Sequence, residues 1–314
     1  MNFQQLRIIR ETVRRKFNLT EVANALHTSQ SGVSKHIKDL EDELGIELFV
    51  RRGKRLLGLT EPGKELVGIV QRMLLDARNI KQLAEQFASA DLGELTVATT
   101  HTQARYALPQ VVVKFKKQFP KVRLVLHQAS PREIATMLLD GSADIGVATE
   151  ALEENPDVTS FPYYSWDHAV IVPAGHELEK ADPLTLEAIA EWPIITYDPG
   201  FTGRSRIDQA FAKEAIVPDI VMTALDADVI KTYVEAGLGI GIIASVAYDP
   251  KRDTGLRLLS AKGLFARNTS RIAVRHGRYL RGYAYRFIEL CSADLTESVV
   301  RSRIAPKADD DVTD

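Results

Sequence analysis

A stripe of apolar residues at heptad spacing divides the sequence into two unlike parts. The stripe lies between residues 61 and 90, where Pro62 suits the first turn of a helix. Its members alternate between spacings of four and three residues: Leu66, Val70, Met73, Ala77, Ile80, Ala84 and Phe87. A helix packed only on its own domain is the simpler reading, but an unbroken seam of this kind favours pairing with a second copy. We therefore expect a linker and dimerisation helix over 61–90.

Residues 1–60 show the pattern of short helices followed by a hairpin. Apolar residues recur every three or four positions, a tight polar turn follows at His27–Ser29, and a further helix begins near Gln30. Gly45 stands where a helix C-cap favours a left-handed residue. Two short apolar segments, 48–50 and 56–60, flank a basic run that contains Gly53. This order predicts a mostly α-helical, winged helix-turn-helix domain over 1–60.

Charge is distributed unevenly along the chain. Residues 1–60 contain 11 Lys and Arg against 7 Asp and Glu, whereas the whole chain has a net charge of −2. A basic first domain on an acidic remainder predicts that only the first domain binds a polyanion such as DNA.

The expected DNA contacts lie at the start of the third helix and in the basic turn. Gln30 has the side chain to bond a base edge, while hydroxyls and cations bond phosphates or bases. The basic turn would hold phosphates or enter the minor groove. The alternative is a plain helical core with solvated lysines. The predicted DNA-binding residues are Thr28, Ser29, Gln30, Ser31, Ser34, Lys35, Lys38, Arg51, Arg52, Lys54 and Arg55.

From Glu94 onward the pattern changes to alternating strands and helices. Several strand candidates are continuous apolar runs, which are typical of a parallel sheet covered on both faces. The helices expected between them lie near 103–118, 131–140, 203–214, 226–236 and 278–292. We therefore expect an α/β effector-binding domain over 91–304, followed by a disordered acidic tail over 305–314.

Three loops of this α/β region place polar side chains where ligands usually bind. Thr100, Thr102 and Gln103 follow one strand, Thr149 follows another, and Thr202 precedes a helix. The carboxyl ends of strands form ligand sites in open sheets, and helix N-termini attract anions. Capping alone is an equal explanation for any single threonine. Together the three loops predict a site for a small anion or a carboxylate.

The segment 26–63, LHTSQSGVSKHIKDLEDELGIELFVRRGKRLLGLTEPG, resembles the DNA-binding domain of LysR-type transcriptional regulators. Ser31-Gly32 stands where most members have Pro-Ala, which alters the start of the recognition helix. The family's DNA target sequence therefore does not transfer directly to this chain. The resemblance extends over almost the whole chain. It implies an effector domain like a periplasmic binding protein, with two subdomains, 93–162 with 268–292 and 163–267.

The stretches TTHTQARYALP, DIGVATE, Tyr163–Trp166 and FTGR are similar to the CysB/Cbl branch of that family. This similarity implies that Thr100, Thr102, Gln103, Thr149 and Thr202 bind the effector, with Trp166 beside the cleft. It also implies activation of sulfate-assimilation and cysteine-biosynthesis genes, an acetylserine or sulfate/thiosulfate-type effector, and antagonism by reduced sulfur compounds. The expected partners are promoter DNA, a second copy within a homodimer or homotetramer, and RNA polymerase.

Other classes of protein fit less well. Gly237, Gly239 and Gly241 follow a helix rather than a strand, which is the wrong order for a dinucleotide loop. The histidines are scattered and Cys291 is the sole cysteine, so neither an enzyme, a metal site nor a cofactor is expected. A transporter's solute-binding protein would need an export signal, and the first residues do not resemble one. We expect a cytoplasmic regulator without a membrane span. A Cbl-like sulfur-source regulator and an aromatic-acid sensor are the alternatives.

Overall fold

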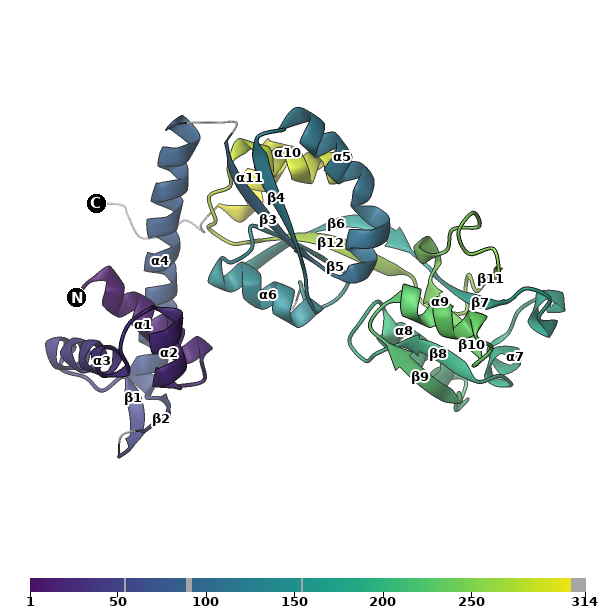
Figure 1. Ribbon diagram of the computed structural model, residues 1–314, viewed down its shortest axis with the longest axis horizontal. Helices are drawn as coiled ribbons and strands as arrows, with labels where there is room; N and C mark the ends of the chain where they lie inside the picture. The colour runs from purple at the N-terminus through teal and green to yellow at the C-terminus, as the bar shows by residue number, and fades with distance from the viewer. Residues whose placement is uncertain (54, 89–91, 154, 306–314) are drawn as a thin grey trace. The chain divides into compact units, whose positions relative to one another are not determined.

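The structure is a computed structural model that describes residues 1–53, 55–88, 92–153 and 155–305. Lys54, an expected DNA contact, and residues 306–314 of the expected tail lie outside the described residues. The chain forms two compact units, Met1–Glu85 and Gln86–Asp314 (Figure 1). Within the part of the chain that is described, no helix has the length and apolar character needed to cross a membrane.

The first unit is a winged helix-turn-helix, as predicted. Its helices and strands are α1 (Phe3–Arg14), α2 (Leu19–Ala25), α3 (Gln30–Leu44), β1 (Phe49–Arg52), β2 (Arg55–Leu59) and α4 (Glu61–Ala88). The Ser29 hydroxyl accepts the Gly32 N–H and so caps α3, and Gly45 ends α3 in the left-handed conformation at φ 68°. Gly45 is therefore the C-cap that the sequence predicted, and Ser29, the last residue of the predicted turn, is the N-cap.

Helix α4 divides its apolar residues between two environments. Val67, Val70 and Leu74 pack in the core of the first unit, together with buried residues of α1, α2 and α3. Further along the same helix, Ile80 is 69% exposed and Phe87 is 85% exposed. Of the heptad stripe itself, Val70 is therefore buried in the first unit and Leu66 and Met73 are partly buried against its core, whereas the later members Ile80 and Phe87 are exposed.

The second unit contains two five-stranded mixed sheets. The strands are β3 (Gly93–Thr99), β4 (Val122–Gln128), β5 (Ile145–Ala148), β6 (Val158–Trp166), β7 (His168–Pro173), β8 (Ile194–Tyr197), β9 (Ile220–Ala224), β10 (Ile240–Ala244), β11 (Leu256–Ser260) and β12 (Asn268–Arg275). The first sheet has the order β4-β3-β5-β12-β6 and the second the order β11-β7-β10-β8-β9. The α/β class with two subdomains is as predicted, but the sheets are not purely parallel, because β12 pairs antiparallel with β5 and β6, and β7 pairs antiparallel with β10 and β11.

Helices cover both faces of each sheet (Figure 1). The helices of this unit are α5 (Pro109–Gln118), α6 (Pro131–Asp140), α7 (Leu186–Ala190), α8 (Arg204–Lys213), α9 (Ala227–Glu235), α10 (Gly282–Cys291) and α11 (Glu297–Ile304). Adjacent residues of a strand point to opposite faces, so Val97 of β3 joins the core under α5, α10 and α11 while Ala98 joins the core under α6. The helix expected over 103–118 is a π-helical turn at Gln103–Ala107 followed by α5.

The chain passes from the first sheet to the second and back. It leaves at the end of β6 and returns at the start of β12, and these two strands pair up to Trp166 opposite Asn268. The boundary expected at 162/163 therefore falls inside β6. We call the part built on the first sheet subdomain I and the part built on the second sheet subdomain II.

Candidate DNA-binding surface and effector cleft

The start of α3 presents a polar, exposed surface. Gln30, Ser31, Lys35 and Lys38 are exposed, and Ser34 is half-buried. Thr28 and Ser29 in the preceding turn are also exposed. Val33, Ile37 and Leu40 on the opposite side of α3 are buried in the core of the unit. The helix is therefore fixed by its apolar face and keeps its polar face free for base edges and phosphates.

The wing contains arginines with different surroundings. Arg51 donates a hydrogen bond of 2.5 Å to Glu41 Oε2, while Glu41 Oε1 accepts the Leu48 N–H at 2.9 Å. Glu41 thus ties α3 to the wing and neutralises part of the Arg51 charge. Arg52 and Arg55 are exposed.

The residues expected to bind the effector are mostly buried between the two subdomains. Thr100, Thr102, Gln103, Trp166 and Thr202 are all buried, and Thr149 is half-buried. Thr102 Oγ1 of subdomain I lies 3.4 Å from Thr202 Oγ1 of subdomain II. The structure therefore brings all six residues to the place where the subdomains meet, with Thr102 and Thr202 in contact.

The Ser270 hydroxyl is the centre of a hydrogen-bond network in this region. It accepts the Gln103 Nε2–H at 2.9 Å and the Trp166 Nε1–H at 3.0 Å, and it lies 3.3 Å from Thr149 Oγ1. A serine hydroxyl has two lone pairs and one proton, so Ser270 has no lone pair left to accept the Thr149 proton. Thr149 therefore keeps its own proton to donate, whether the Ser270 proton goes to Thr149 or to Tyr164. The network therefore leaves a donor at Thr149.

His168 fixes the loop that carries Thr202. Its Nε2 lies 3.1 Å from the Thr202 carbonyl oxygen, and its Nδ1 lies 3.3 Å from Asn268 Nδ2. Because a carbonyl only accepts, Nε2 carries the proton and Nδ1 accepts from Asn268. Burial lowers the pKa of His168 to about 4 and keeps the ring neutral.

Glu150 bridges the two subdomains. It follows β5, and its Oε1 accepts the N–H of Gly203, the residue before α8. Gly203 has φ of 71°, and a Cβ there would lie 2.4 Å from Asn268 Oδ1, so only glycine fits. Burial raises the pKa of Glu150 to about 7. Its Oε2 is buried and has no hydrogen-bond partner within the described part of the chain.

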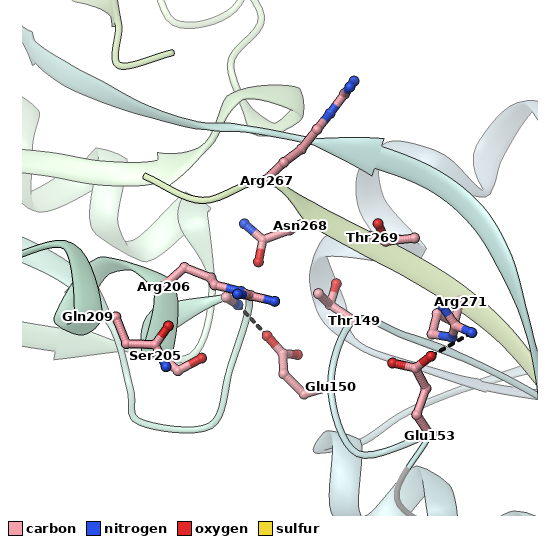
Figure 2. A pocket seen from close by; sticks show the side chains of 11 residues that line it. Thr149, Glu150, Glu153, Ser205, Arg206, Gln209, Arg267, Asn268, Thr269 and Arg271 are labelled. Carbon is pink, nitrogen blue, oxygen red and sulfur yellow. Dashed lines mark hydrogen bonds and ion pairs between the residues drawn. The ribbon is translucent and has the colours of Figure 1, made fainter. Parts of the chain in front are cut away.

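A cavity of about 400 Å³ opens beside these residues. Figure 2 shows its wall, formed by the residues after β5, the first turn of α8 and the start of β12. Of the six expected effector residues, only Thr149 lines this cavity. The other five lie outside its lining, and four of them are threonine or glutamine side chains enclosed by protein.

One cluster of histidine and aspartate has ligand atoms within 4.8 Å of one another: His101, Asp226 and Asp228. Asp228 already accepts from Tyr106 at 2.7 Å and pairs with Lys231 at 3.2 Å and Arg105 at 3.4 Å. The nearby cations take the place of a metal ion, so this cluster is an ion-pair network.

Sequence reasoning missed Ser270, Asn268, His168 and Glu150. The polar triplet at residues 268–270 before an apolar run was the available signal for two of them. Because β12 runs antiparallel to β5, its first residues lie at the same sheet edge as the last residues of β3 and β5. That signal requires the strand direction, which the sequence pattern did not supply.

The geometry defines a class of protein: a DNA-binding winged helix-turn-helix joined to a two-subdomain domain with a polar cleft. Two family models match the chain. The model for the bacterial regulatory helix-turn-helix protein, lysR family, covers residues 3–64, and the LysR substrate binding domain covers residues 88–296. The chain belongs to the LysR family of transcriptional regulators, whose substrate-binding domain binds small-molecule effectors.

Comparison with individual relatives identifies a smaller group within the LysR family. The chain is 61% identical over 300 residues to the HTH-type transcriptional regulator SsuR of Burkholderia cenocepacia, with 96% of this chain and 97% of SsuR covered. It is 48% identical over 309 residues to CysB of the same species, with 98% and 99% covered. The crystal structure of the cofactor-binding domain of the Cbl transcriptional regulator matches with a TM-score of 0.66 and 48% identity, over 68% of this chain and 93% of that one.

The chain is therefore a LysR-type regulator of the CysB/Cbl/SsuR group. The prediction that it is a transcriptional regulator rather than an enzyme is confirmed, and the solute-binding alternative is wrong.

Proposed function

We propose that this protein regulates genes of sulfur acquisition and responds to a small effector bound in its cleft. The observation that carries the proposal is the similarity to sulfur-related regulators over nearly the full length of both chains. The first candidate function, by similarity to CysB, is the activation of sulfate-assimilation and cysteine-biosynthesis genes. Regulation of the use of an alternative sulfur source is the second candidate, favoured by the higher identity to SsuR than to CysB.

The proposed effector is an acetylserine or a sulfate- or thiosulfate-type anion. The proposed contacts are Thr100, Thr102, Gln103, Thr149, Trp166 and Thr202. The available proton of Thr149 supports an acceptor-rich ligand. An aromatic acid would need apolar surface that these side chains do not supply.

DNA binding is assigned to the exposed start of α3 and to the wing. In the proposed arrangement Gln30 bonds a base edge, supported by Ser31, Ser34, Lys35 and Lys38. The wing arginines bond phosphates, with Arg52 and Arg55 free of the ion pair that holds Arg51. Phosphate contacts give affinity and base contacts give sequence preference.

We propose that the protein acts in the cytoplasm as a homodimer or homotetramer on promoter DNA, where it contacts RNA polymerase. The exposed Ile80 and Phe87 on α4 support pairing of two copies through this helix. The effector would bind the open and closed arrangements of the subdomains differently, and so change the separation of the DNA-binding domains.

A thermal-shift titration of the full-length protein tests the effector assignment. Sulfate, thiosulfate, O-acetylserine and N-acetylserine are compared with benzoate. A ligand at 100 times its dissociation constant adds about 2.7 kcal/mol to stability, which shifts the transition by a few degrees. Thr100→Val should lose the shift, and Thr223→Val, at an exposed strand position, should keep it. A shift with benzoate alone would contradict the sulfur assignment.

A further inference from the structure

The first unit contains a pocket formed by the turn between α1 and α2, the first residue of α3 and the wing strand β2. Its volume is about 410 Å³, and all of its lining residues belong to the first unit. They are Lys16, Phe17, Asn18, Leu19, Thr20, Gln30, Arg55 and Leu56. The wall therefore combines two cations with neutral side chains and contains no carboxylate, so it attracts an anion.

The two cations of this wall are not compensated by acidic residues. Lys16 and Arg55 are exposed and have no ion pair within the described ranges of the chain. Glu21 is close in sequence, but it does not line the pocket, and its Oε1 accepts the Asn18 Nδ2–H at 2.9 Å. The Thr20 hydroxyl also lines the pocket and adds a neutral donor.

The backbone of the turn does not explain why a lysine stands at position 16. Arg15 is the C-cap of α1, and Lys16 follows it with a left-handed φ of 49°. Helices commonly end on glycine at this position, because glycine adopts such a φ without steric cost. A cation near a helix C-terminus complements the helix dipole, but Arg14 and Arg15 already supply that charge. A function of the Lys16 side chain beyond the turn is therefore indicated.

Phe17 fixes this turn against the wing. It also has a left-handed φ, of 67°, and its N–H donates to the Thr12 carbonyl at 2.8 Å. Its ring packs edge-on against the buried Phe49 of β1, with the ring centroids 6.2 Å apart. Because β1 pairs with β2, the backbone of Lys16 is held in place relative to that of Arg55.

We propose that this pocket binds a phosphate group of the DNA backbone, which Lys16 and Arg55 hold together with the Thr20 hydroxyl. Gln30 lines the same pocket, so a phosphate bound here would fix α3 next to the base that Gln30 contacts. Another basic pocket of this unit is lined by α1 and α4 alone and offers no such arrangement. The inference rests on the proposed assignment of DNA binding to the first unit, and it adds a contact from outside α3 and the wing.

The salt dependence of DNA binding tests the charge contact. Fluorescence anisotropy of a labelled duplex with the full-length protein gives log K against log salt, and Lys16→Gln should make the slope shallower by about 0.9 for each protomer on the DNA. Lys16→Arg should restore the wild-type slope. Arg15→Gln is the matched control and should keep it, because Arg15 lies 4.0 Å from Glu11 Oε2 and does not line the pocket.

Lys16→Gly separates the phosphate contact from a structural role of the lysine. Glycine suits the left-handed φ, so the thermal midpoint of this variant should equal or exceed that of the wild type. Its salt slope should match that of Lys16→Gln. A lower midpoint with a wild-type slope would show that Lys16 only stabilises the turn, and would overturn the proposal.

Ethylation interference on a promoter fragment of a sulfur-acquisition operon locates the phosphate. Lys16→Gln and Arg55→Gln should lose interference at the same phosphate and keep it at the others. An unchanged pattern in Lys16→Gln, or a slope loss as large in Arg15→Gln, would overturn the proposal. If the wild type binds the promoter and Gln30→Ala reduces its sequence preference, that result leaves the proposed function intact. A wild-type protein that binds no DNA would contradict both.

Discussion

Replacement of Glu150 by glutamine should stabilise the second unit of the protein, and increasingly so as the pH rises. Burial raises the pKa of this carboxylate from 4.5 to about 7. The folded state therefore holds its proton over a range where the unfolded chain has released it. Stability from this group is present below about pH 4.5 and is lost as the pH rises through 7. Glutamine keeps an acceptor for the Gly203 N–H and carries no charge to bury.

The size of the effect follows from the shift. One pKa unit corresponds to about 1.4 kcal/mol, so the full penalty on the ionised wild-type side chain is about 3 kcal/mol. Near pH 5.5 the carboxyl of the folded protein is mostly protonated, so only about 1 kcal/mol of this penalty remains. E150Q should thus exceed the wild-type free energy of unfolding by about 3 kcal/mol at pH 8 and by about 1 kcal/mol at pH 5.5.

Urea denaturation followed by tryptophan fluorescence measures this difference. Both tryptophans of the chain, Trp166 and Trp192, lie in the second unit, so the signal reports on that unit alone. E153Q is the control, because Glu153 is 63% exposed and the loss of its ion pair with the half-buried Arg271 should change stability by less than about 1 kcal/mol without a pH trend. A destabilised E150Q at pH 8, or a difference that does not change with pH, would refute the reasoning.

Three further perturbations probe other parts of the account. The wild-type protein should lose up to about 3 kcal/mol of stability as the pH falls from 6.5 to 4, because the buried neutral ring of His168 must gain a proton on unfolding, and His168→Gln should abolish this loss. Parallel melts of both proteins over this pH range check the prediction, and identical pH profiles would count against it. Gln30→Ala should reduce preference for the specific site more than non-specific affinity, measured by competition with unrelated DNA; an equal loss would remove Gln30 as a base contact. Arg52→Ala should make the salt dependence of DNA binding shallower by about one unit of log K per log salt, whereas an unchanged slope would exclude a phosphate contact.

The first unit could be predicted from sequence because its signals are local. Ser29 and Gly45 mark the ends of α3 by their own conformational preferences, and the basic turn marks the wing. The apolar stripe predicted α4 correctly, but its spacing could not distinguish the residues packed in the first unit from those left exposed. That division depends on which neighbours fold against the helix, which no local pattern records.

Only part of the effector cleft could be predicted from the sequence. Thr100, Thr102 and Thr149 follow strands, which is a local feature, and the sequence predicted them as effector contacts. Ser270 and Glu150 act through partners more than fifty positions away, and they become visible only once β12 lies antiparallel beside β5. Strand β6 contains Pro162 and two tyrosines and lacks the continuous apolar run typical of the other strands, yet it pairs with β12 from Val158 to Trp166 with one register shift.

The central claim is that a ligand in the cleft of the second unit changes how the first unit binds DNA. Fluorescence anisotropy of a labelled promoter fragment from a sulfur-acquisition operon, titrated with the full-length protein with and without saturating sulfate or O-acetyl-L-serine, measures it directly. The account predicts an affinity change of at least fivefold that Thr100→Val abolishes while its ligand-free affinity for DNA stays at the wild-type value. An affinity that no ligand of this class changes, or a response that survives Thr100→Val, would contradict it.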